Sequence, residues 1–246
     1  MTHDDHDWIT VHRAKFAQPI DAMEQNFRVP PRASCARVGI DTHLGEDGMP
    51  VLNSDVWGAW TICQNRQVAE QIIDDPDVQF PLLRAAIETW HCLLVPYTHR
   101  GDVNWRGVIE SGSALRLASG PASGAIAVIT TAGYDSDTSI EPPRIQEFIQ
   151  NVSRTRDYFS SCKGNRGAAL FASCDDREGM TFTLWDSEAY MVSAAYGAGM
   201  HSKQLEHHRT RPFFDRSSFT RARVISTSGK WDGHCPLKNA EYSVHK

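Results

Sequence analysis

Long apolar runs are missing from this sequence of 246 residues. No stretch approaches the roughly 20 apolar residues that a membrane-spanning helix requires, and the first residues, MTHDDHDW, are acidic and polar, unlike a secretory signal. An excess of basic residues is missing too. The net charge of −5 and the pI of about 6.1 argue against a nucleic-acid-binding protein. We therefore expect a cytoplasmic protein with no integral membrane segment and no nucleic-acid partner.

Paired cysteines and the common catalytic signatures are also missing. The six cysteines are scattered and form no C-x-x-C pair, which argues against a disulfide framework and against a zinc site. The sequence contains no glycine-rich dinucleotide loop, no Walker loop, no G-x-S-x-G elbow and no H-E-x-x-H motif. Any chemistry must therefore rest on residues outside these signatures.

The residues that are present form an ordinary globular composition, 41% hydrophobic and 22% charged, in a chain long enough for a sizeable core. Alternating apolar and polar residues and turn signals predict two successive series of elements. In the first half, we expect strands at 8–14, 35–41 and 56–62, helical segments at 20–27, after Asn65 and at 81–87, and then an apolar run at 90–96. In the second half, we expect strands at 125–131, 167–173, 180–185 and 219–227, and helices at 143–159 and after Ser187.

The two series have the same order, which indicates an internal repeat. Asn65 and Ser187, both expected N-caps, are 122 residues apart, and Trp105 and Trp231 are 126 apart. The pattern predicts an α+β fold in which tandem ferredoxin-like repeats form an α+β barrel within one chain. The repeats would cover 1–110 and 124–233, joined by a linker at 111–123 and followed by a loose tail at 234–246. Coincidence of generic α/β alternation is the alternative interpretation.

The segment 180–214 holds the most informative candidate residues. It predicts a strand, a short helix, a glycine break and a second helix at about 200–211, which Pro212 ends. His201 and His208 share one face of that helix but lie roughly 10 Å apart along its axis, too far to bind one metal ion together. A single imidazole that faces an apolar cavity suits a haem iron.

Aromatic and basic residues around His201 could complete such a haem site. The candidate walls are Phe182, Trp185, Phe213 and Phe214, and Arg209 could pair with the haem propionates. The alternative interpretation is that His201 is a helix-start residue bonded to backbone and that the arginines form a solvated face.

Four stretches resemble the spheroidene monooxygenase family: VWGAW at 56–60, MTFTLWDS at 180–187, the segment from 199–201 to 213–214, and WDG at 231–233. The resemblance implies a dimeric α+β-barrel plan, haem b, oxygen insertion, and reducing equivalents from a partner protein such as ferredoxin. It also implies that His201 is the axial ligand of the iron. The same plan allows a homodimer.

The acidic composition and the mean hydropathy of −0.42 favour a small or medium-sized substrate of specialised metabolism over a membrane-dissolved polyene. If His201 holds the haem, Arg154 and Arg156 are the candidate catalytic groups on the opposite side, although a solvated basic helix end explains them equally well. Two other functions stay open. One is a redox-neutral haem dehydratase acting on an N–O bond, like the aldoxime dehydratases, and the other is a cofactor-free barrel oxygenase or binding protein.

Overall fold

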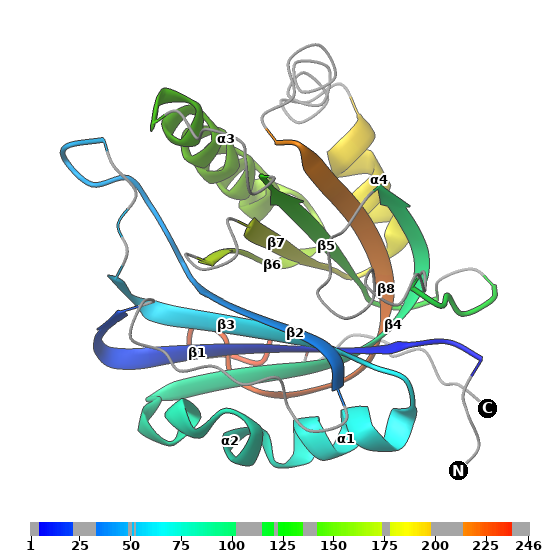
Figure 1. Ribbon diagram of the computed structural model, residues 1–246. Coiled ribbons are helices and arrows are strands. Elements are labelled where there is room, and N and C mark those ends of the chain that lie inside the picture. Colours follow the sequence, from blue (N-terminus) through cyan, green and yellow to red (C-terminus); the bar gives the residue numbers. More distant parts are fainter. Residues whose placement is uncertain are drawn as a thin grey trace.

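Eight antiparallel strands form a closed barrel, and helices lie on its outside (Figure 1). The computed structural model describes residues 5–21, 33–48, 51, 53–101, 115–120, 123–134, 142–173, 178–197 and 214–237. The barrel with its outer helices confirms the α+β class predicted from the sequence.

The first half contains β1 (Trp8–Asp21), β2 (Ala33–Ile40), β3 (Asn53–Cys63), α1 (Arg66–Asp74), α2 (Pro76–Gln79), the 3-10 helix η1 (Pro81–Ala85) and β4 (Glu88–Gly101). Strands β1, β2 and β3 were predicted, and the apolar run at 90–96 lies within β4. The N-cap is confirmed because the Asn65 side chain accepts a hydrogen bond from the Val68 amide at 3.0 Å. The helix predicted at 20–27 is wrong at its start, since Ile20 continues β1 and pairs with Ser54. Residues 22–27 of that prediction lie outside the described residues.

The second half contains β5 (Ile126–Gly133), α3 (Pro142–Ser161), β6 (Asn165–Ser173), β7 (Glu178–Trp185), α4 (Glu188–Tyr196) and β8 (Arg216–Gly229). Every predicted strand and helix of 125–196 is present. Ser187 caps α4 and accepts a hydrogen bond from the Tyr190 amide. The order of elements is the predicted one.

The strand order around the barrel is β1-β3-β2-β6-β7-β5-β8-β4, and β4 pairs back onto β1. Within each half the order is the same, β4-β1-β3-β2 and β8-β5-β7-β6. The two seams between the halves differ greatly. Strands β4 and β8 pair from Trp90↔Gly229 to Gly101↔Ser218, whereas β2 and β6 pair at the single position Ile40↔Ala172. The barrel is therefore weakly closed at the β2–β6 seam.

Alternation along the strands divides the core into an inner and two outer parts. The inner core holds Trp60, Trp90, Phe182, Trp231 and Leu237, all at most 4% exposed. On the outer face of the first half a second core packs under α1 and η1, and on that of the second half a third core packs under α3 and α4 (Figure 1).

The connecting segments are better packed than their composition indicates. Leu237 is 1% exposed in the inner core and the backbones of Trp231 and His234 pair, so the described start of the tail is anchored to the barrel through Leu237. In the linker, the Arg116 guanidinium donates to Asp7 at 2.7 Å and to the Gln64 carbonyl at 2.8 Å. Within the described part of the chain, no helix combines the length and the apolar character needed to cross a membrane.

Candidate functional site

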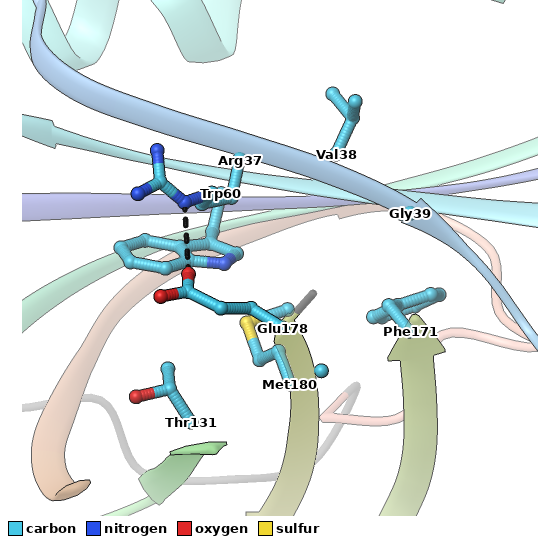
Figure 2. A pocket seen from close by; sticks show the side chains of 10 residues that line it. Arg37, Val38, Gly39, Trp60, Thr131, Phe171, Glu178 and Met180 are labelled. Carbon is cyan, nitrogen blue, oxygen red and sulfur yellow. Dashed lines mark hydrogen bonds and ion pairs between the residues drawn. The ribbon is translucent and has the colours of Figure 1, made fainter. Parts of the chain in front are cut away.

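A cavity lies inside the barrel at the weak β2–β6 seam (Figure 2). It encloses about 310 Å³ of empty space, part of it open to solvent. Five strands supply its lining: Arg37, Val38, Gly39, Gly58, Trp60, Thr131, Phe171, Glu178, Gly179 and Met180. Both halves of the chain therefore build one site.

Two glycines let the halves approach at this seam. A Cβ atom on Gly58 would lie 2.4 Å from carbons of the Phe171 ring, and one on Gly39 would lie 2.8 Å from the Ala172 carbonyl oxygen. Larger residues at either position would push β6 away from β2 and β3. The small residues thus set the shape of the cavity wall.

A cluster of three charged side chains lies at the edge of the cavity. The Glu178 carboxylate accepts from Arg37 Nε at 3.2 Å, and its other oxygen lies 3.2 Å from Arg216 Nη1. Strand register explains the second pair, because Glu178 and Arg216 both pair with Gly133, whose missing side chain lets them meet over it. Figure 2 shows the Arg37–Glu178 pair beside the Trp60 ring. We call Arg37, Glu178 and Arg216 the ionic cluster.

Uncharged polar groups continue this edge along β8. The hydroxyls of Thr131 and Ser218 lie 2.7 Å apart, and His99 Nδ1 lies 2.8 Å from the Thr220 hydroxyl. Thr220 pairs with Ile129 of the inner core, so its side chain and that of His99 face the barrel interior. The inner wall is therefore polar near the cavity.

Farther along the barrel the inner wall is aromatic. Trp90 contacts Phe182 and Trp231 with ring centroids 5.7 and 5.1 Å apart, and the Arg13 guanidinium lies 4.4 Å from the centre of the Trp231 ring. The cavity itself combines the ionic cluster at its edge with the apolar side chains of Trp60, Phe171 and Met180, which suits an organic ligand with one polar end.

A second buried polar group lies outside the barrel, on the face covered by α1 and α2. His12 Nδ1 and His91 Nδ1 are 2.9 Å apart, and His12 Nε2 is 2.9 Å from the Thr10 hydroxyl. Burial and the neighbouring His91 lower the pKa of His12 well below its ordinary value, and burial lowers the pKa of His91 to about 4. The described residues contain no group of three or more His, Cys, Asp or Glu placed to hold a metal ion. The pair is therefore a neutral hydrogen-bonded element of the core.

The structure separates the predicted aromatic walls. Phe182 lies in the inner core, whereas Trp185, three residues along β7, faces outward and packs against Phe159. Phe214 lies against Tyr134 and Phe148, with ring centroids 5.0 and 4.4 Å away. These three predicted residues therefore do not border one common cavity.

The predicted catalytic arginines lie on α3 and do not line the cavity. Arg154 is exposed, and Arg156 forms an ion pair with Asp41 at 3.3 Å, one residue beyond β2. Burial raises the pKa of Asp41, and Arg156 offsets part of that rise. His201, Arg209 and Phe213 lie outside the described residues. The roles assigned to these five residues stay predictions.

Sequence reasoning missed the ionic cluster and His99. One signal was available, because Arg37 lies within the strand predicted at 35–41, where a charged residue in an apolar stretch is conspicuous. Glu178, Arg216 and His99 lay outside the predicted strands, so their faces were not assigned. Only the register of β7, β5 and β8 brings Glu178 and Arg216 together.

Comparison with known proteins places the chain beside an oxygenase. No protein-family model matches the sequence. Spheroidene monooxygenase of Rubrivivax gelatinosus is 28% identical over 177 residues, which cover 72% of this chain and 63% of that protein. The resemblance to the spheroidene monooxygenases is confirmed. The chain spans less than two thirds of the length of that relative.

Solved structures support the fold. An aldoxime dehydratase in complex with butyraldoxime has a TM-score of 0.54 and 9% identity, over 90% of this chain and 80% of that one. A haem-degrading enzyme from Listeria monocytogenes covers 87% of this chain and 97% of its own at 8% identity, but its TM-score of 0.30 is too low to argue from. The first likeness extends the shared architecture to nearly the whole chain.

Proposed function

We propose that this protein is a haem-dependent monooxygenase that inserts oxygen into a small or medium-sized organic molecule of specialised metabolism, held in the barrel cavity. The observation that carries the proposal is the 28% identity to a spheroidene monooxygenase over 72% of the chain. The cavity adds a candidate substrate site, because apolar and charged side chains from both halves of the chain line it. The acidic composition favours such a substrate over a membrane-dissolved one.

The proposal includes an architecture of two tandem ferredoxin-like repeats, residues 1–110 and 124–233. The identical strand order of the two halves supports it. So do the corresponding N-caps, Asn65 before α1 and Ser187 before α4.

The cofactor in this proposal is haem b, with His201 as the ligand of the iron and Arg209 as a partner of a propionate. The described site has one feature that fits such a group, because the two guanidiniums of the ionic cluster are the type of side chain that pairs with propionates. When bound, the haem supplies the activation of molecular oxygen. Electrons come from a donor protein such as ferredoxin, and a homodimer is the proposed assembly.

The chain's own residues bind and orient the substrate. Trp60, Phe171 and Met180 exclude water from its apolar part, and Arg37, Glu178 and the Thr131 hydroxyl hold its polar end. Arg154 and Arg156 are the proposed catalytic groups, whose guanidiniums would stabilise negative charge that develops during the reaction. Support for Arg156 comes from its ion pair with Asp41, which follows the cavity strand β2.

The test is a visible spectrum of the protein expressed with a haem precursor, beside His201→Ala and the control His207→Ala, predicted to lie on another face of the same helix. We expect a Soret band that shifts or disappears in His201→Ala and persists in His207→Ala. A Soret band that is unchanged in His201→Ala would show that another residue is the ligand of the iron. A colourless wild type would contradict the haem proposal and leave a cofactor-free barrel.

A redox-neutral dehydratase is separated from the monooxygenase by a second measurement on the haem-loaded protein. A monooxygenase consumes oxygen and reductant in step with product, whereas a dehydratase consumes neither. Turnover that continues without oxygen would therefore contradict the monooxygenase proposal.

A further inference from the structure

Charged side chains occupy three inward positions of this barrel. Arg37 pairs across strands with Trp60 of the inner core, Glu178 is two residues before the inner Met180, and Arg216 has the same parity along β8 as the inner Ala222. Their side chains are only 10%, 15% and 18% exposed. The interior of a small barrel is ordinarily filled with apolar side chains.

Such a cluster is costly to bury, which makes a purely structural role a poor explanation. Removing charges from water costs several kcal/mol per ion, and well-packed apolar residues of similar volume are often as stabilising as a buried ion pair. The cluster also draws on β2 in one half and on β7 and β8 in the other, at the seam where the backbone pairing is weakest. Buried charges that converge on a cavity are characteristic of ligand sites.

We propose that the ionic cluster binds the carboxylate of an organic anion whose apolar body lies against Trp60, Phe171 and Met180. The ligand carboxylate pairs with the guanidiniums of Arg37 and Arg216. Glu178, which accepts a hydrogen bond from Arg37 and forms an ion pair with Arg216, holds the two guanidiniums in position. The inference deepens the proposed function and rests on it for the nature of the ligand. The carboxylate belongs either to the substrate or to a haem propionate.

The test compares two probes of equal shape and different charge on the haem-free protein, 2-naphthoate and 2-naphthamide, by isothermal titration calorimetry. Because a hydrogen bond to a charged group contributes about 1.5–3 kcal/mol, we expect the anion to bind at least about tenfold more tightly than the amide. Equal affinities, or no binding of the anion at millimolar concentration, would overturn the proposal.

Two variants should change the preference for naphthoate over naphthamide in opposite directions. Arg37→Gln removes a guanidinium and should bring naphthoate down to the affinity of naphthamide. Glu178→Gln removes the competing carboxylate and should raise the affinity for naphthoate. The control is Arg166→Gln, an equal change of charge on β6, since Arg166 is half exposed, pairs with Asp186 and does not line the cavity. If Arg37→Gln does not fold, the proposal is still tested by the affinities of the wild type for naphthoate and naphthamide and by the affinity of Glu178→Gln for naphthoate.

The same titration on haem-loaded protein separates the two sources of the carboxylate. Naphthoate binding that haem abolishes assigns the cluster to a propionate, and binding that survives assigns it to the substrate. Both results support the carboxylate site. A protein that never binds haem would refute the proposed cofactor. The comparison of naphthoate with naphthamide on the haem-free chain would still test whether the ionic cluster binds a carboxylate.

Discussion

The buried His12–His91 pair should make the protein sensitive to acid. In the folded state burial lowers the pKa of His91 to about 4, and it lowers that of His12 well below its ordinary value. In the unfolded chain both imidazoles return to about 6.5. Below that pH the unfolded state binds protons that the folded state does not, so the free energy of unfolding falls as the pH falls.

The size of the effect follows from His91. The difference between about 6.5 and about 4, at about 1.36 kcal/mol per pH unit, corresponds to about 3 kcal/mol lost between pH 7 and pH 4. His12, completely buried beside it, adds a loss of the same sign. Such a loss is a large fraction of the roughly 5–15 kcal/mol that stabilises a typical domain.

The assay is urea unfolding at pH 7, 6, 5 and 4 for the wild type, His91→Gln and the control His234→Gln, an exposed histidine in the turn after β8. Gln at position 91 can hydrogen-bond to His12 and cannot take up a proton. We expect its loss of stability between pH 7 and 4 to be smaller than that of the wild type by about 3 kcal/mol, and that of His234→Gln to match the wild type. If the free energy of unfolding falls with pH by the same amount in the wild type and in His91→Gln, the reasoning is refuted.

Three further substitutions test the packing at the seam and the start of α1. Gly58→Ala should destabilise the protein by about 1–3 kcal/mol, because its Cβ would lie 2.4 Å from the Phe171 ring. Gly179→Ala, whose Cβ would lie 3.7 Å from its nearest neighbour, should leave the thermal midpoint nearly unchanged; equal midpoints for both variants would contradict the close approach. Asn65→Ala should lose about 1 kcal/mol in chemical unfolding, since the Val68 amide loses its capping oxygen; an unchanged midpoint would show that the cap contributes nothing.

The candidate site was predicted less well than the fold. Phe182 and Trp185 were chosen as walls of one pocket because both are aromatic and close in sequence, yet alternation along β7 puts them on opposite faces. Arg154 and Arg156 were chosen on a predicted helix, but whether a helix faces the cavity depends on how it docks. In the structure α3 lies outside the barrel and Arg156 pairs with Asp41.

The sequence by itself determined the order of strands and helices, the caps at Asn65 and Ser187, and the resemblance to an oxygenase family. These features depend on residues within a few positions of each other, so periodicity, capping residues and short motifs are enough to predict them. The tertiary structure decided which residues form the cavity. Arg37 and Glu178 are 141 positions apart and meet only because β2 and β7 lie on either side of β6 in the barrel. Strand pairing over that separation depends on the register of the whole sheet, which no local pattern encodes.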